Sequence, residues 1–252
     1  MRPEIDVVGI PIKTFGLMFA LAFLACGLMM AKRFKELGKP TDYAYEIIFA
    51  ALIGGIVGSR LYWLVQHYDE AKDDLVGNLF SGSGLVWYGG VIGGAIAVIG
   101  WAYFRGMLNL TLLDITAPGL ALGYAIGRAG CQLSGDGDYG SKTDLPWGMA
   151  YPHGAVPTDD KVHPSPIYES LAMGLVALWL WRRRDDYRPG ILFAWYLVLS
   201  GLERFLVEFV RRNEVTAIGI TVPAIESLIL ALVGVVWLVL AQRRYDGLRL
   251  AT

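Results

Sequence analysis

The sequence predicts an all-α membrane protein whose chain crosses the bilayer seven times. Hydrophobic residues make up 55% of its 252 residues and charged residues only 18%, against about 25% charged in an ordinary soluble domain. The apolar residues stand in blocks, and a spanning helix needs about 20 such residues. A net charge of -1 excludes a basic protein that binds nucleic acid. The composition also makes a soluble enzyme an unlikely class.

Seven apolar stretches are long enough for a membrane span, although the fifth is short and is expected to be tilted or partly re-entrant. Pro40, Pro189 and Gly190 interrupt the connections between them. In chain order, the expected spans are Phe15–Ala31, Glu46–Gln66, Leu85–Phe104, Leu112–Cys131, Pro166–Trp181, Gly190–Val210 and Ile218–Ala241.

The flanks and small residues of these stretches support the assignment. Glu4 and Asp6 precede the first span, and six more spans follow it, so it does not resemble a cleaved signal peptide. The second and third spans carry similar runs of small residues, 54–59 and 89–94. These runs predict close helix contact and not a true sequence repeat.

Lysine and arginine in the loops predict the orientation of the chain. Twelve of them fall on one side: Lys32, Arg33, Lys35, Lys39, Arg105, Arg182, Arg183, Arg184, Arg188, Arg243, Arg244 and Arg249. Seven fall on the other: Arg2, Lys13, Lys72, Lys142, Lys161, Arg211 and Arg212. The richer side is expected to be cytoplasmic, which places the N-terminus outside and the C-terminus inside. The long connection 132–165 then lies outside, folded at the membrane surface, within a single domain 1–252.

Ionisable residues inside spans are costly in free energy and usually mark function. With this orientation, polar groups at six of the seven spans converge on the outer leaflet: Arg60, Tyr88, Arg128, His163, Tyr168, Glu169, Arg204, Glu208 and Glu226. Ser200, Arg204, Glu208 and Arg211 recur on one helix face. Guanidinium groups bind phosphate through two parallel hydrogen bonds, so a lipid phosphate is the expected ligand. Asp114, near the opposite surface, is interpreted as a helix-end residue.

The most specific local feature is the glycine-rich segment 127–140, which begins with Arg128 and contains Asp136 and Asp138. Its glycines permit a tight backbone beside a ligand. The segment lacks the lysine and the strand–loop–helix setting of a nucleotide-binding loop, and it has too few oxygen ligands for an EF-hand. The scattered histidines form no zinc motif. No metal or other cofactor is expected.

Five segments in this order resemble the prolipoprotein diacylglyceryl transferase family, and the resemblance covers nearly all seven spans. They are Gly55–Tyr62, Tyr88–Gly93, Gly127–Gly130 with the loop that follows, His163–Glu169 and Gly201–Arg211. The resemblance implies a multi-pass enzyme of the bacterial inner membrane. Such enzymes transfer the diacylglyceryl group of phosphatidylglycerol to the lipobox cysteine of a prolipoprotein, and glycerol phosphate leaves. The implied partners are phosphatidylglycerol, other membrane lipids and the prolipoprotein signal peptide.

The family's essential arginines match Arg128 and Arg204, and its glutamate matches Glu208. The histidine of its HGG motif is replaced by Tyr88, and two loop asparagines are replaced by Cys131 and Ser134. Further tyrosines of the family fall at Phe15 and Ser200. The acidic residue of its loop matches either Asp136 or Asp138, because this loop is one residue longer.

These matches give each candidate residue an expected role. Arg128 and Arg204 would bind the phosphate and stabilise the leaving group, and Glu208 would orient Arg204. Tyr88 would position the lipid, because a phenol with a pKa near 10 is a poor base at neutral pH. Asp138 is the preferred base, while Asp136, His163 and the field of the arginines remain alternatives. The residues expected to bind substrate are Arg60, Ser134, Asp136, His163, Tyr168, Glu169 and Arg211.

Two other functions stay open at this point. The chain could be a related phospholipid-dependent transferase with a different acceptor. It could also be a membrane protein that binds or transports a lipid or a small anion. Transporters are expected to use repeats and discontinuous helices near the midplane. Polar groups gathered toward one leaflet favour chemistry at the membrane interface.

Overall fold

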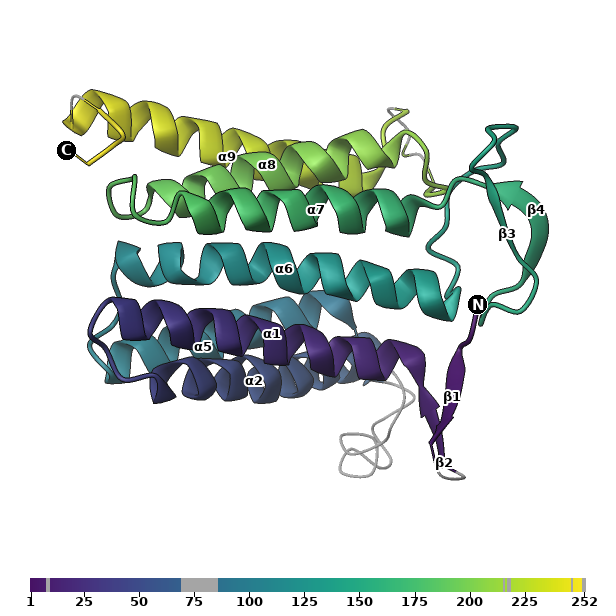
Figure 1. The fold of residues 1–252 in the computed structure, drawn as a ribbon, viewed down its shortest axis with the longest axis horizontal. Helices are drawn as coiled ribbons and strands as arrows, with labels where there is room; N and C mark the ends of the chain where they lie inside the picture. The colour runs from purple at the N-terminus through teal and green to yellow at the C-terminus, as the bar shows by residue number, and fades with distance from the viewer. Residues whose placement is uncertain (8–9, 69–85, 215, 217–218, 246, 251–252) are drawn as a thin grey trace. The chain divides into compact units, whose positions relative to one another are not determined.

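The computed structural model of the protein describes residues 1–7, 10–68, 86–214, 216, 219–245 and 247–250. In these residues, seven helices carry most of the chain and two short antiparallel hairpins accompany them (Figure 1). The hairpin strands are β1 (Glu4–Val7), β2 (Ile10–Lys13), β3 (Met149–Tyr151) and β4 (Thr158–Val162). The helices are α1 (Thr14–Glu36), α2 (Asp42–Gln66), α5 (Trp87–Phe104), α6 (Leu110–Ser134), α7 (Ser165–Arg182), α8 (Ile191–Glu208) and α9 (Val222–Tyr245).

Each predicted span coincides with a helix, and most of the boundaries differ by only a few residues. Helices α1, α2, α6 and α9 are long and apolar enough to cross a membrane, while α5 is apolar but shorter. Helix α8 is continuous, but charged residues interrupt its apolar sequence at Glu203, Arg204 and Glu208. Leu85 and Ile218, at the starts of two predicted spans, and Lys72 lie outside the described residues. The chain is therefore a helical membrane protein.

The chain contains two compact units. The larger unit contains residues Met1–Met29 and Leu113–Thr252, and the smaller contains Met30–Leu112.

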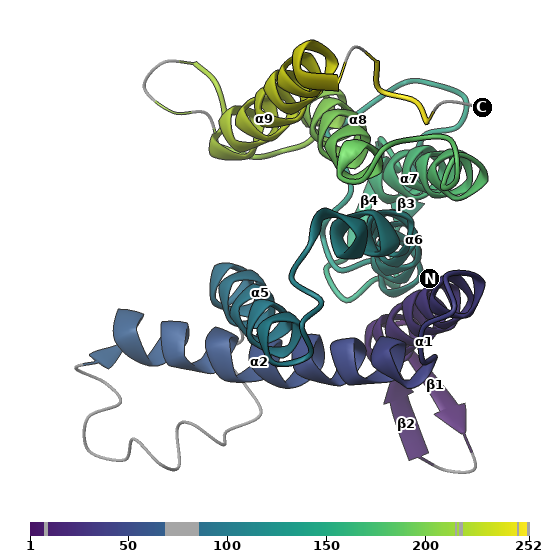
Figure 2. The same cartoon turned by 90° about the vertical axis from the view of Figure 1, so that its left-hand side faces the viewer.

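In the smaller unit, glycines bring α2 and α5 into direct backbone contact (Figure 2). A Cβ added at Gly54 would lie 2.6 Å from the carbonyl oxygen of Gly93. One added at Gly58 would lie 2.7 Å from the Cα of Gly93. No side chain fits between such surfaces, so the prediction of close helix contact from the small-residue runs is confirmed.

In the larger unit, α6 to α9 lie side by side (Figures 1 and 2). The core between α6, α7 and α8 is built mainly from small and aliphatic residues: Ala117, Ala121, Ala125, Met173, Ala177, Leu180 and Leu192. Asp114 accepts hydrogen bonds from the backbone N–H groups of Gly190 (2.7 Å) and Phe193 (2.8 Å). Asp114 lies near the start of α6 and therefore stabilises the beginning of a different helix, α8.

The connection 132–165 contains a hairpin and a small core of its own. Its hairpin β3–β4 encloses a small core of Tyr139, Tyr151 and Val162. The Tyr139 hydroxyl donates to the carbonyl of Val156 at 3.0 Å. This fold lies at the end of the larger unit where α6 ends and α7 begins (Figure 1). The first hairpin, β1–β2, was not predictable from the sequence, because two four-residue strands carry too short a pattern to be recognised.

Candidate active site

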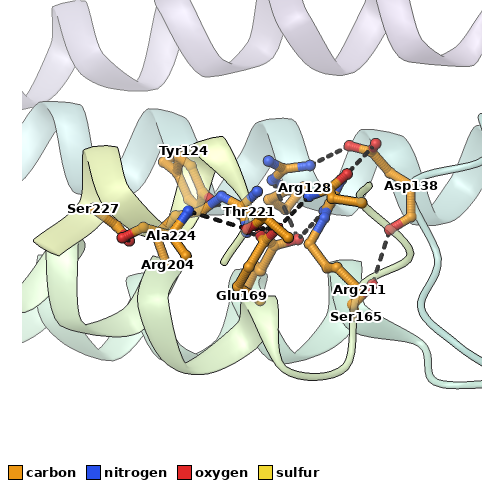
Figure 3. A network of polar contacts seen from close by, with 12 residues as sticks. Tyr124, Arg128, Asp138, Ser165, Glu169, Arg204, Arg211, Thr221, Ala224 and Ser227 are labelled. Atoms are coloured by element: carbon orange, nitrogen blue, oxygen red, sulfur yellow. Dashed lines mark hydrogen bonds and ion pairs between the residues drawn. The ribbon is translucent and has the colours of Figure 1, made fainter. Parts of the chain in front are cut away.

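Polar side chains from α6, α7 and α8 meet at this end of the larger unit (Figure 3). Arg128 lies near the end of α6, one turn after Tyr124, and its Cζ is 5.1 Å from the centre of the Tyr124 ring. The Tyr124 hydroxyl donates to Glu169 Oε1 at 2.9 Å, and Arg128 Nε lies 3.4 Å from Glu169 Oε2. Glu169 is fully buried in the second turn of α7. A buried carboxylate of this kind requires charged or hydrogen-bonding partners, and both surround it.

A second arginine completes an alternating network of charges. Arg211 donates to Glu169 Oε2 at 3.2 Å and to Asp138 Oδ1 at 2.8 Å. Arg128 forms an ion pair with the other oxygen of Asp138. Ser165 holds the backbone of the loop by donating to the Asp138 carbonyl at 2.8 Å. Two guanidinium groups are thus bridged by two carboxylates, and each carboxylate contacts both arginines.

Asp138 is held in its charged form by this arrangement. Its partial burial raises its pKa, but the positive charges of Arg128 and Arg211 and their hydrogen bonds outweigh burial and lower the pKa below its ordinary value. A carboxylate with a lowered pKa is a weak proton acceptor at neutral pH. The structure therefore favours Asp138 as a group that positions the arginines over Asp138 as the base.

Arg204 and Glu208 form a separate pair on α8. Arg204 Nη1 lies 2.5 Å from Glu208 Oε2. Glu208 is buried, and its other oxygen accepts from Asn213 Nδ2 at 2.6 Å and from Thr221 Oγ1 at 2.7 Å. Thr221 stands just before α9 and also accepts the backbone N–H of Ala224 at 3.3 Å. The start of α9 therefore fixes the carboxylate that faces Arg204.

Arg204 differs from the other two arginines in how many partners it has. Among the described residues, its one ion-pair partner is Glu208. Arg128 and Arg211 each contact two carboxylates. Arg204 therefore retains hydrogen-bonding capacity for an added anion.

The predicted single face of α8 extends only to Glu208. Ser200 donates to the carbonyl of Tyr196 at 2.6 Å, one turn earlier. The helix ends at Glu208, and Arg211 follows in a tight turn in which its N–H bonds to the Glu208 carbonyl at 3.2 Å. Arg211 consequently joins the network of Arg128 and not the face of Arg204.

The glycine-rich loop places its two aspartates differently. Gly135 and Gly137 have φ angles of 60° and 97°, which only glycine adopts without strain. Asp136 accepts the backbone N–H of Asp138 at 3.3 Å, while Asp138 reaches the arginines. Ser134 is buried and donates to the carbonyl of Cys131 at 3.2 Å.

Two cavities lie beside this loop. One, of about 350 Å³, is lined by Gly137, Asp138, Tyr139, Arg211, Arg212 and Asn213. The other, of about 530 Å³, is lined by Pro3, Glu4, Lys13, Phe15, Ser134, Asp136 and Ala155. Asp138 and Arg211 thus border the first cavity, and Ser134 and Asp136 border the second.

His163 and Tyr168 form a neighbouring pair. His163 Nδ1 lies 3.4 Å from the Tyr168 hydroxyl, which also accepts from Trp147 Nε1 at 2.8 Å. The backbone of His163 is anchored to Gly140 and Ser141. This anchorage connects the pair to the glycine-rich loop.

Two predicted site residues belong to the smaller unit. Arg60 is buried in α2, only 4% exposed, and its Nη1 has no hydrogen-bond partner among the described residues. Tyr88 lies in the first turn of α5 and is 44% exposed. The network described above belongs entirely to the larger unit.

One group of side chains has the composition of a cation site. Cys131, Asp136 and Asp138 place possible ligand atoms within 4.8 Å of one another. Both oxygens of Asp138 already contact guanidinium groups, whose charge repels a cation. These residues therefore do not suit a metal ion.

The model of the prolipoprotein diacylglyceryl transferase family matches residues 4–240. The chain belongs to this family. A phosphatidylglycerol–prolipoprotein diacylglyceryl transferase of Clostridium tetani is 33% identical over 216 residues, which cover 84% of this chain and 86% of the relative. Enzymes of the same name from Methylococcus capsulatus and Chlorobaculum tepidum are 32% and 34% identical. Those two alignments cover 96% and 85% of this chain and 97% and 79% of the relatives.

The structure also places four residues beside these side chains that the sequence did not single out: Tyr124, Glu203, Asn213 and Thr221. Two of them carried a readable signal. Tyr124 stands four residues before Arg128, the spacing of neighbours on a helix face. Thr221 precedes Val-Pro at the start of a helix, where threonine often caps the first turn. Asn213 carried no such signal, because its contact depends on the turn after α8.

Proposed function

We propose that the chain transfers the diacylglyceryl group of phosphatidylglycerol to the lipobox cysteine thiol of a prolipoprotein. The reaction takes place at the outer leaflet of the bacterial inner membrane, and glycerol phosphate leaves. Membership of the family supports the reaction. The observation that carries the site assignment is that Arg204 pairs with a single carboxylate among the described residues, Glu208, beside a network of two further arginines.

In this proposal, Arg204 contacts the phosphate of the lipid and stabilises the charge that develops on the leaving group. Glu208 orients Arg204 and is itself held by Asn213 and Thr221. Arg128 supplies the second guanidinium. A fork of N–H donors suits a phosphate because two parallel hydrogen bonds form at once.

The remaining members of the network hold Arg128 in place. Asp138, Glu169 and Arg211 contact Arg128 or one another. The loop 135–140 orders the headgroup, and the cavity that Asp138 and Arg211 border is the space available to it. Other side chains are proposed to contact the lipid or the acceptor: Arg60, Ser134, Asp136, His163 and Tyr168. Tyr88 is proposed to position the lipid.

The proposed topology has seven spans, an outer N-terminus and a cytoplasmic C-terminus. Lys161 in β4 and Lys35 in α1 are both exposed, so each accepts a cysteine with little cost to folding. Cysteine at position 161 should react with a membrane-impermeant maleimide in intact cells. Cysteine at position 35 should react only after permeabilisation. The reverse pattern would place the proposed site at the inner leaflet.

Complementation tests the reaction. A strain depleted of its own transferase accumulates unmodified prolipoprotein, and expression of this chain should restore the modified form. Purified protein should also transfer the diacylglyceryl group to a lipobox peptide in vesicles that contain phosphatidylglycerol. If the purified protein consumes the lipid but leaves the peptide unmodified, it is a transferase with another acceptor. If it binds the lipid without turnover, it is a binding or transport protein.

A further inference from the structure

Among the carboxylates near Arg204, Glu203 is the one that receives no hydrogen bond from the described residues. It directly precedes Arg204 in α8, its side chain is half-buried, and its Oε1 is buried without a hydrogen bond. No residue in the described part of the chain forms a hydrogen bond or an ion pair with it. Asp138, Glu169 and Glu208, in contrast, each receive at least two contacts from donors.

The groups around Glu203 come from several elements. Its carboxylate interacts electrostatically with Arg128 on α6, Glu169 on α7, Arg204 on α8 and Arg211 beyond it. Tyr124 on α6 is a further neighbour. Helix α9, which packs against α8, carries one acidic residue, Glu226.

Carboxylates outnumber guanidinium groups among these side chains, so one carboxylate can take up a proton during the reaction. Three guanidinium groups, of Arg128, Arg204 and Arg211, face four carboxylates, of Asp138, Glu169, Glu203 and Glu208. A bound lipid phosphate would add a further negative charge, which raises the proton affinity of nearby acids. Glu203 gains the proton at the lowest cost, because it alone loses no hydrogen bond when its charge disappears.

We propose that Glu203 is the base that accepts the proton of the acceptor thiol, an inference that rests on the proposed function. The thiol S–H bond breaks and the proton passes to a Glu203 oxygen. The sulfur then forms a bond to the glycerol carbon of the lipid while the bond from that carbon to the phosphate oxygen breaks. The proton on Glu203 passes to the departing phosphate, which has gained a negative charge. The step needs no further reactant.

Replacement of Glu203 by glutamine tests this role, since the amide keeps the shape and cannot take the proton. The kcat of transfer to a lipobox peptide should fall by about 100- to 10,000-fold, the usual contribution of a general base. The KM for phosphatidylglycerol should change little. The rate of the variant should rise with pH up to the thiol pKa of about 8.5, because only thiolate formed in solution then reacts. Glu203→Asp should retain part of the activity. The matched control is Glu214→Gln, an exposed glutamate that should behave as wild type.

A peptide with selenocysteine at the acceptor position separates proton removal from a loss of structure. A selenol is already ionised at neutral pH, so Glu203→Gln should use it almost as fast as wild type does. Equal losses with thiol and selenol in both Glu203→Gln and Glu203→Asp would overturn the proposal, as would an unchanged kcat and pH profile. Wild-type protein that transfers nothing to the peptide would instead refute the proposed function.

Discussion

Replacement of Arg204 by alanine is expected to lower transfer by tens- to thousands-fold. Loss of one partner of a buried charged contact costs about 2–5 kcal/mol, and here it also leaves Glu208 buried beside an empty space. Arg204→Lys should restore only part of the rate, because an ammonium group cannot form the two parallel hydrogen bonds. Arg128→Ala should lose activity to a similar extent, since Asp138 and Glu169 then lose a shared cation.

The measurement is transfer to a lipobox peptide by purified protein at saturating lipid. Arg243→Ala is the matched control, because Arg243 is exposed in the last turn of α9 and should tolerate the change. Near-normal turnover of either Arg204→Ala or Arg128→Ala, at normal expression, would reduce that arginine to a structural role.

Asp138→Asn is expected to lose most of the activity, while Tyr88→Phe keeps a measurable rate. The amide leaves Arg128 and Arg211 without the negative charge between them, so both guanidinium groups lose their fixed positions. Tyr88 is 44% exposed and contributes at most a hydrogen bond to the lipid in this proposal. The two variants are compared by kcat and KM for phosphatidylglycerol.

The pH dependence of Asp138→Asn distinguishes a positioning role from a base. If Asp138 positions the arginines, the variant is slower at every pH and the profile keeps its shape. If Asp138 is the base, the rise of rate with pH disappears. An inactive Tyr88→Phe together with a normal Asp138→Asn would contradict both roles and point to the Tyr88 phenol.

The stability that Asp138 contributes through its ion pairs with Arg128 and Arg211 should be lost only at strongly acidic pH. The folded-state pKa of Asp138 lies below its unfolded value of about 4, so its contribution to stability is present above that value. This contribution is lost as the pH falls through the folded pKa. Wild-type protein should therefore keep this part of its thermal stability at pH 5 and lose it only in stronger acid, a loss that Asp138→Asn should not show.

The helices were predictable because their signal is local. A block of about 20 apolar residues must pair its own backbone groups in a membrane, and a helix does so within the block. For this reason, α1, α2 and α6 appear close to their expected bounds. The glycine runs 54–58 and 89–93 indicated close contact for a similarly local reason, since small residues leave backbone surfaces exposed to a neighbour. The order of motifs also pointed to Arg128, Arg204 and Glu208 before any geometry was known.

The partners of these residues depended on tertiary structure. Asp136 and Asp138 are equivalent in sequence, and the torsions of Gly135 and Gly137 direct only Asp138 to the arginines. Arg211 contacts Glu169 and Asp138, which precede it by 42 and 73 positions in the sequence. These contacts form because α8 ends early and α6 and α7 pack beside it. The same packing leaves Glu203 without a hydrogen-bond donor among the residues that the structure describes. Periodicity along one helix predicts which residues share a face, but ion pairs between elements depend on distances that only the packed chain defines.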